Sequence, residues 1–151
     1  MPCWRPANLS ARAPGGGSGG SIYVTTATLT GTGSFAADGA DAGNSSGGGG
    51  GGGRIAVYYS SSPSFSGFVA TTAKGGSGQE AGQYGTVAFL NTSTSNPHLY
   101  VYQELDLPED SMSSYDAITL DNGATLRVGG GSTIDIGGEL TLRGGATLLA
   151  E

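Results

Sequence analysis

A repeat in residues 118–151 limits the fold more strictly than any other feature of this sequence. The segment ITLDNGATL at 118–126 recurs as LTLRGGATL at 140–148, so position 118 corresponds to position 140. A third short segment, TIDI at 133–136, lies between the two copies. Each segment places aliphatic residues at positions i and i+2, which is typical of a β-strand with one buried face.

Glycines separate these segments at 123, 129–131, 137–138 and 144–145, and they indicate turns. Three short strands and three turns in about 22 residues form one coil of a parallel β-helix, an architecture recognised by its fixed repeat length. The sequence therefore predicts an all-β fold, a right-handed parallel β-helix with glycine-rich loops. In it, Leu140 stacks on Ile118 and Leu148 on Leu126, one strand spacing of about 4.8 Å apart.

A longer repeat precedes this one. Ile22, Ile55 and Val87 begin similar apolar triplets with a period of about 33 residues, and Phe35 and Phe68 follow the same spacing. Each unit contains a strand, a short link, a second strand around the Phe and a glycine-rich excursion. Because insertions in repeat proteins map to turns, we interpret the excursions as loops.

The excursions cover residues 38–53 and 74–85, and the first contains seven consecutive glycines at 47–53. Such a run offers no side chain to a core. It forms either a mobile loop or a polyglycine layer that lies close against a neighbouring backbone. The sequence leaves both alternatives open.

These patterns predict one domain after a short lead-in. Residues 1–14 form an extended N-terminal lead-in, and residues 15–151 form a single β-helix domain. Within that domain, residues 15–91 carry the longer glycine-rich repeats, residues 92–117 form an acidic connecting segment, and residues 118–151 carry the shorter coils. No stretch keeps a 3.6-residue apolar period, so a helical fold is disfavoured.

Charge and composition restrict the partners. The net charge of −6 disfavours nucleic acid and anionic membranes, which require a basic face, but allows cations, neutral glycans and neutral small molecules. The N-terminus shows no apolar signal-peptide region, although the low-charge, glycine-rich composition is typical of secreted proteins. The chain ends within a repeat, without a polar cap. We therefore expect a piece of a larger extracellular or cell-surface protein, with self-association through uncapped ends.

The repeats also resemble a known group. The glycine-rich segments at 15–22 and 47–59 resemble the glycine-rich repeats of large secreted or surface-attached bacterial proteins. The Gly-Ala-Thr-Leu units at 123–126 and 145–148 look like the parallel β-helix repeats of autotransporter passengers and phage tail spikes. The resemblance implies extracellular adhesion or scaffolding, and in some members cleavage of polysaccharides.

The first candidate site is a calcium site. Asp38, Asp41 and Asn44 present oxygen atoms at i, i+3 and i+6 in a glycine-rich segment. Calcium is bound by six to eight oxygens, and main-chain carbonyls could complete the set. The alternative is that these residues shape tight turns, which is the commoner use of Asp and Asn.

The second candidate is an acidic group in residues 104–116. Glu104, Asp106 and Asp110 are the weak candidates for catalytic carboxylates, because two close carboxylates can act as acid and base or bind calcium. Glu109 and Asp116 belong to the same acidic segment. The alternative is a solvated loop that protects a sheet edge.

His98 is the single histidine, so a serine–histidine–acid triad would require it. No Ser in a strand-turn-helix context accompanies it. We interpret His98 as a surface loop residue after Pro97.

Tyrosines make the third candidate, a ligand surface. Tyr58, Tyr59, Tyr100 and Tyr102 lie on predicted strands. Exposed tyrosines at alternating positions are suited to stacking on sugars or contacting proteins. The alternative is cross-strand packing under a loop.

The leading functional prediction is a structural or adhesive segment of an extracellular protein that binds a glycan, a small molecule or a partner protein. The alternative is a calcium-dependent hydrolase or lyase. It would act on a polysaccharide or on a small ester or lactone.

Overall fold

The computed structural model describes residues 14–44 and 46–151, and every helix or strand assigned in them is a β-strand. The all-β prediction is therefore confirmed. The strands are β1 (Ser21–Gly31), β2 (Arg54–Phe65), β3 (Thr86–Asn91), β4 (His98–Val101), β5 (Glu104–Leu107), β6 (Met112–Tyr115), β7 (Ala117–Leu120), β8 (Thr125–Val128), β9 (Thr133–Ile136), β10 (Leu140–Leu142) and β11 (Thr147–Ala150). Most of the predicted lead-in, residues 1–13, lies outside the described residues.

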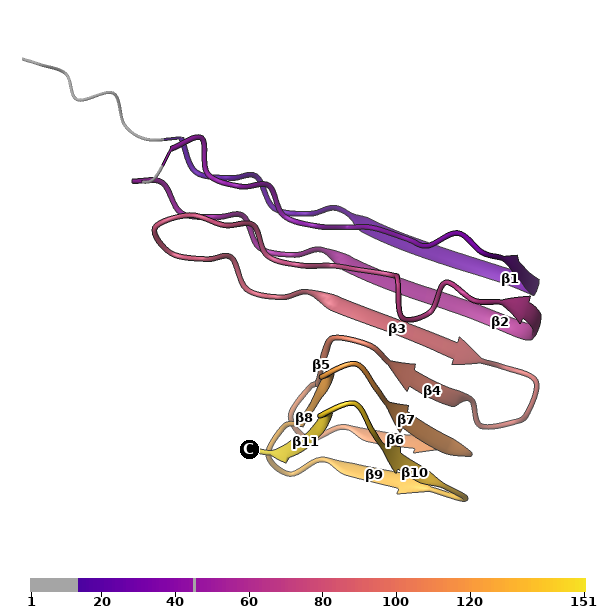
Figure 1. Cartoon of the computed structure of the whole chain (residues 1–151). Helices are drawn as coiled ribbons and strands as arrows, with labels where there is room; N and C mark the ends of the chain where they lie inside the picture. Colours follow the sequence, from indigo (N-terminus) through magenta and orange to yellow (C-terminus); the bar gives the residue numbers. More distant parts are fainter. Residues whose placement is uncertain (1–13, 45) are drawn as a thin grey trace, which may run out of the picture.

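The strands form three sheets. A six-stranded sheet has the order β1-β2-β3-β4-β7-β10, a three-stranded sheet has the order β11-β8-β5, and β6 pairs with β9. Figure 1 shows the long strands β1, β2 and β3 side by side, with the short strands β4 to β11 gathered at the other end of the molecule. The glycine-rich segments continue backwards from the starts of the long strands.

Both repeat lengths correctly predict which residues pair on neighbouring strands. Ile22 pairs with Ile55, and Ile55 with Val87, in parallel strands. Leu140 pairs with Ile118, and Leu148 with Leu126, also in parallel. Residues one repeat apart thus occupy equivalent places on neighbouring strands.

The prediction of a right-handed parallel β-helix is nevertheless wrong. Strands β3 and β4 are antiparallel, so the six-stranded sheet is mixed and the chain reverses direction between the two repeat regions. The reason is the short polar link at residues 92–97. A parallel connection needs a crossover of about a dozen residues or more, whereas this link allows only a hairpin. Asn91 stabilises the turn by accepting a hydrogen bond from the Ser93 amide through its side chain, at 3.0 Å.

The reversal places two hydrophobic cores on opposite faces of the same sheet. Successive residues of a strand point to opposite faces. In β3, Val87 and Phe89 belong to the first core, while Ala88 belongs to the second. Strand β3 pairs with β4, and β4 pairs with β7. The face of the sheet that holds Ala88 in β3 therefore holds Leu99 in β4 and Ile118 in β7.

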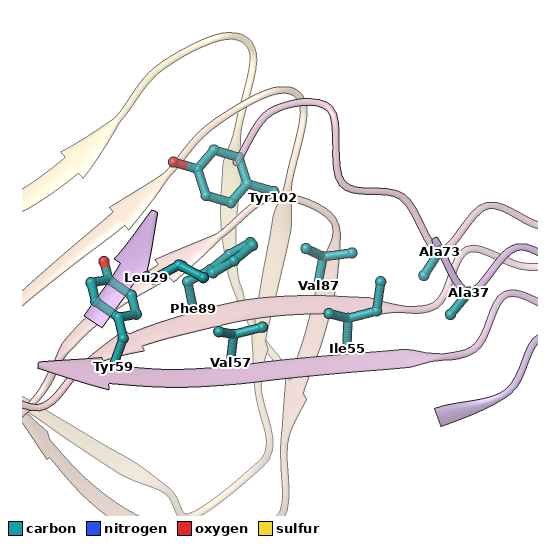
Figure 2. Packing of buried hydrophobic residues seen from close by; sticks show 9 residues of the cluster. All are labelled: Leu29, Ala37, Ile55, Val57, Tyr59, Ala73, Val87, Phe89 and Tyr102. Carbon is teal, nitrogen blue, oxygen red and sulfur yellow. The ribbon is translucent and has the colours of Figure 1, made fainter. Parts of the chain in front are cut away.

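The first core lies between the long strands and the returning chain. Figure 2 shows its buried side chains in a row along β2 and β3, with Ala37 and Ala73 of the returning segments at the end near Ile55 and Tyr102 at one side. Phe35, Phe65 and Phe68 add an aromatic layer, and the rings of Phe68 and Phe89 meet edge to face at 4.9 Å. The second core fills the space between the short strands, with Leu120 and Leu126 fully buried.

Extended glycine-rich segments form a layer beyond the starts of β1, β2 and β3, here called the glycine layer. It consists of residues 14–20, 37–43, 47–53, 72–78 and 79–85. The amides of Gly16 and Gly19 donate to the carbonyls of Gly48 and Gly51, both at 2.8 Å. The bonds recur at every third residue, which is the repeat of a polyproline II-type helix.

The run of seven glycines occupies the centre of this layer. The Gly49 amide donates to the main-chain carbonyl of Glu80 at 2.8 Å, and the Gly50 amide donates to that of Ala40 at 2.9 Å. The Gly50 carbonyl accepts from the Gly76 amide at 2.7 Å. Together with the bonds from residues 16 and 19, segment 47–53 therefore bonds to all four other segments. Of the two alternatives for this run, the polyglycine layer is confirmed.

Glycine is required in the layer because the backbones touch. A Cβ added at Gly50 would lie 2.0 Å from the Gly17 carbonyl oxygen, and one at Gly52 would lie 1.9 Å from the Ala73 carbonyl oxygen. No side chain fits at such distances. At Gly51, by contrast, the nearest atom to an added Cβ would be 3.9 Å away, because that position faces outward.

Candidate ligand-binding groove

A groove of about 400 Å³ opens where the glycine layer meets the short strands. Its lining comes from the layer, from the bend after β4 and from the turn before β8: Lys74, Tyr84, Tyr102, Gln103, Glu104, Asn122, Gly123 and Thr125. Its volume lies within the range of small-molecule sites in proteins. The lining combines two tyrosines, the side-chain amides of Gln103 and Asn122, a threonine hydroxyl and one charge of each sign.

One side-chain and two main-chain hydrogen bonds fix the bend that forms one wall. The Gln103 side-chain carbonyl accepts a hydrogen bond of 2.7 Å from the Ala73 amide, which joins the bend to the glycine layer. The Tyr102 amide donates to the main-chain carbonyl of Val87 at 3.1 Å. The Thr125 amide donates to the main-chain carbonyl of Gln103 at 3.2 Å. The wall is therefore held by three different segments of the chain.

Two tyrosines line the groove in different ways. Tyr102 is only 4% exposed and stacks on Phe68, with ring centroids 6.0 Å apart. Burial, with a smaller contribution from the nearby Asp121 carboxylate, raises the pKa of Tyr102 to about 12. Its hydroxyl thus keeps its proton at neutral pH. Tyr84 is 57% exposed.

The turn before β8 is a left-handed turn. Asn122 and Gly123 have φ angles of 59° and 74°, and the equivalent residues one repeat later, Gly144 and Gly145, have 62° and 80°. Asp121 supports the turn, since its carboxylate accepts the Asn122 amide at 2.8 Å. The turn places Asn122 and Gly123 at the rim of the groove.

Arg127 forms ion pairs with two members of the predicted acidic group, Glu104 and Asp106. Arg127 Nη1 lies 3.2 Å from Glu104 Oε2 and 3.1 Å from Asp106 Oδ1, and Arg127 Nε lies 3.8 Å from Glu151 Oε1. Strands β5 and β8 align Asp106 with Arg127, which explains the contact. The hydrogen bonds to Glu104 and Asp106 raise the pKa of Arg127 above its usual value. The sequence analysis did not identify Arg127 as a site residue. Its position about one short repeat after Asp106 could have predicted that the two lie on neighbouring strands.

Three members of the acidic group line a second depression, which is open and has a volume of about 650 Å³. They are Asp106, Glu109 and Asp110, and Arg127 and Glu151 line it with them. Within residues 14–44 and 46–151, no three His, Cys, Asp or Glu side chains are grouped so that they could hold a metal ion.

The interpretation of His98 as a surface loop residue is wrong, because His98 is the first residue of β4 and is half-buried against neutral neighbours. Its ring stacks on Tyr100 with centroids 4.0 Å apart, and its Nε2 lies 3.1 Å from the Thr119 hydroxyl oxygen. Burial lowers the pKa of His98, although the Glu139 and Asp116 carboxylates oppose this effect. The ring is therefore mainly neutral at pH 7.

The three predicted calcium ligands make separate hydrogen bonds. Asp38 accepts from the Lys74 amide at 2.6 Å, and Asp41 accepts from the Ser77 amide at 2.7 Å. Both carboxylates thus join segment 37–43 to segment 72–78 of the glycine layer. The Asn44 side chain accepts from the Ser46 amide at 3.0 Å, as in a local turn. Calcium binding by these residues stays a prediction.

The four tyrosines predicted as a ligand surface are separated by the fold. Tyr59 and Tyr102 lie in the first core, at 2% and 4% exposure, rather than on a surface. Tyr100 is half-buried against His98. Tyr58 lies on the opposite face of the sheet beside Tyr23, with ring centroids 5.3 Å apart. Tyr84, which lines the groove, lies on no strand and is absent from the strand pattern.

The chain matches no family model, no curated protein and no solved structure. Its described residues contain no helix that is long and apolar enough to cross a membrane.

Proposed function

We propose that this chain is a non-catalytic structural and adhesive segment of an extracellular or cell-surface protein, and that its groove binds a neutral glycan. The observation that carries this proposal is the exposed Tyr84 ring beside the amide and hydroxyl groups of Asn122 and Thr125. An aromatic ring provides a flat apolar contact, and fixed polar groups provide orientation, which together suit a sugar ring.

The charges of the groove favour a neutral ligand. Lys74 and Glu104 contribute one charge of each sign, and Glu104 also pairs with Arg127. The chain as a whole carries a net charge of −6, which repels polyanions. A neutral oligosaccharide therefore fits this surface better than a uronate polymer or a nucleic acid.

The groove is also preorganised. Tyr102 is packed into the first core, and Gln103 is bonded to the glycine layer at 2.7 Å. Groups that are held in place before binding lose less conformational entropy when a ligand arrives. This rigidity favours binding of a ligand.

Arg127 argues against the alternative of a hydrolase or lyase centred on Glu104 and Asp106. Each of these carboxylates directs an oxygen to the guanidinium, at 3.2 and 3.1 Å. A glycosidase needs one carboxyl group that donates a proton and a second that attacks or activates water. Both groups here serve as partners in an ion-pair network.

A glycan array with neutral and uronate-containing oligosaccharides tests the proposal, followed by calorimetric titration with the best neutral ligand. We expect Tyr84→Ala to weaken binding by about tenfold or more, since one stacking contact is lost. Tyr23→Ala is the matched control, because Tyr23 is 72% exposed but lies outside the groove. The control should bind as the unmodified chain does.

Two results would overturn the proposal. One is selective binding of uronate oligosaccharides with none of the neutral ones. The other is a neutral-glycan affinity that falls with Tyr23→Ala and not with Tyr84→Ala, which would place the site on the β1–β2 face.

A further inference from the structure

We propose that Asn122, at the rim of the groove, is a site of spontaneous deamidation and converts to aspartate and isoaspartate. The reaction replaces a neutral amide by a carboxylate in the proposed glycan site. Asparagine is among the chemically labile side chains of proteins, and a following glycine leaves its reacting atoms unhindered. The chemical step depends on the turn alone, whereas its effect on ligand binding rests on the proposed function.

The sequence supplies the reacting pair of residues once. Asn122 and Gly123 form the one Asn-Gly pair in the chain. One repeat later, the same two positions of the turn are occupied by Gly144 and Gly145, and the φ angles of 59° at Asn122 and 62° at Gly144 are nearly equal. An asparagine is therefore not required to form this turn.

The reacting groups of the turn are accessible. Both Asn122 and Gly123 are exposed, and a Cβ added at Gly123 would meet nothing within 4 Å. The amides of Asn122 and Ala124 donate to Asp121, at 2.8 and 3.1 Å. The Gly123 amide between them donates none of the hydrogen bonds found among the described residues. Its nitrogen is thus available as a nucleophile, and solvent reaches it.

The reaction needs no co-reactant other than water. The Gly123 nitrogen loses its proton to solvent and attacks the side-chain carbonyl carbon of Asn122, and ammonia leaves. Water then opens the resulting succinimide ring at either of its two carbonyl carbons. One opening gives aspartate, and the other gives isoaspartate, whose main chain runs through the former side chain. The attack requires the turn to rotate out of its left-handed conformation, which a short surface turn does more readily than a strand.

Either product changes the groove. The side-chain amide of asparagine donates and accepts hydrogen bonds, whereas a carboxylate only accepts them. The charged residues of the lining are Lys74 and Glu104, so a carboxylate at position 122 leaves two negative charges and one positive charge. Isoaspartate also adds a main-chain atom between the Asp121 carbonyl and the Ala124 amide, which meet at 3.1 Å. The groove therefore loses a hydrogen-bond donor, and isoaspartate loosens the turn at its rim.

Peptide mapping by mass spectrometry tests the chemical step on the full chain, kept folded at mildly alkaline pH. Asn122 should be the first of the described asparagines to convert, giving two products of equal mass that separate by chromatography. Asn91 is the matched internal control, because its side-chain oxygen already accepts the Ser93 amide at 3.0 Å and a threonine follows it. Asn122→Gly, which copies Gly144, should fold and should lack both products.

Two results of the mapping would overturn the proposal. One is an Asn122 that stays intact in the folded chain after Asn91 has converted. The other is an Asn122 that converts in urea but never in the folded chain, since the native turn would then block the attack.

A titration with a neutral oligosaccharide measures the effect on binding separately. The converted chain and Asn122→Asp should each bind about threefold more weakly or worse than the fresh chain, because one hydrogen-bond donor is lost. Equal affinities would show that the conversion does not regulate the groove. If the fresh chain binds no neutral glycan, the proposed function fails, whereas the peptide map still decides whether Asn122 deamidates.

Discussion

The glycine layer and the short strands β4 to β11 solve the same packing problem in two ways. Both regions place equivalent residues of successive repeats beside one another. In the glycine layer the backbones touch, and a Cβ at Gly50 or Gly52 would meet a carbonyl oxygen at 2.0 or 1.9 Å. In the short strands, aliphatic side chains such as Leu126 fill the space between the walls. Repeat length alone therefore does not indicate whether neighbouring segments meet through their backbones or through side chains.

Glycine itself has different roles in the two regions. In the layer, glycine allows close approach of extended segments. In the short-strand region, Gly123 and Gly145 have φ angles of 74° and 80°, and an added Cβ at either would meet nothing within 4 Å. At these two positions, glycine allows a left-handed turn rather than a close contact. A substitution to alanine should therefore have different consequences at different glycines.

The largest effect should come from Gly50→Ala. The added methyl group would lie 2.0 Å from the Gly17 carbonyl oxygen, which belongs to the backbone and cannot rotate away. We expect the free energy of unfolding to fall by about 4 kcal/mol or more, because severe overpacking of backbone exceeds the usual core penalty. Urea unfolding followed by circular dichroism measures this change.

Gly51→Ala is the matched control, with 3.9 Å to the nearest atom. It should change the stability by less than about 1 kcal/mol. Equal losses for the two variants would contradict the close-packed layer.

A smaller effect is expected for Leu126→Ala in the second core. Leu126 is fully buried between β5 and β11, and the loss of its side chain leaves a cavity. Removal of a buried leucine costs about 2–5 kcal/mol, and we expect about 3 kcal/mol. Differential scanning calorimetry should show the loss as a lower midpoint of unfolding.

The control in the same region is Gly137→Ala, whose methyl group would lie 3.9 Å from the nearest atom. Its stability should stay within about 0.5 kcal/mol of the unmodified chain. Equal losses of unfolding free energy for Gly137→Ala and Gly50→Ala would show that close backbone contact does not explain the effect at Gly50.

The smallest effect concerns acid stability through Asp41. Hydrogen bonds from the amide and hydroxyl of Ser77 lower the pKa of Asp41 below its ordinary value of 3.8. A carboxylate with a lowered pKa stabilises the folded state above the ordinary pKa. This contribution is lost as the pH falls through the lower, folded-state value. We expect the unmodified chain to lose stability below about pH 4, with part of this loss absent in Asp41→Asn.

Thermal melts across the acid range measure this difference. Asp135→Asn is the comparison, since no hydrogen bond or ion pair of the Asp135 side chain occurs among the described residues. Identical acid profiles for Asp41→Asn and the unmodified chain would show that the Ser77 contacts contribute nothing to stability.

The sequence by itself determined the strand register. The shorter repeat aligned Leu140 with Ile118, and the longer repeat aligned Ile22 with Ile55, since equivalent apolar residues pair when successive repeats run in parallel. The period-2 alternation in each strand likewise determined the all-β class. These signals are local, and the residues that carry them are adjacent in the chain.

Only the tertiary structure decided the direction of β4, the face of the sheet that each core occupies, and the partners of the charged groups. The reversal turns β4 antiparallel to β3, and Tyr102, directly after β4, lies in the first core. Arg127 meets Glu104 because β5 and β8 come together from separate repeats. The choice between a mobile loop and a packed layer at residues 47–53 depended on four segments distant in sequence, whose backbones approach too closely for any side chain.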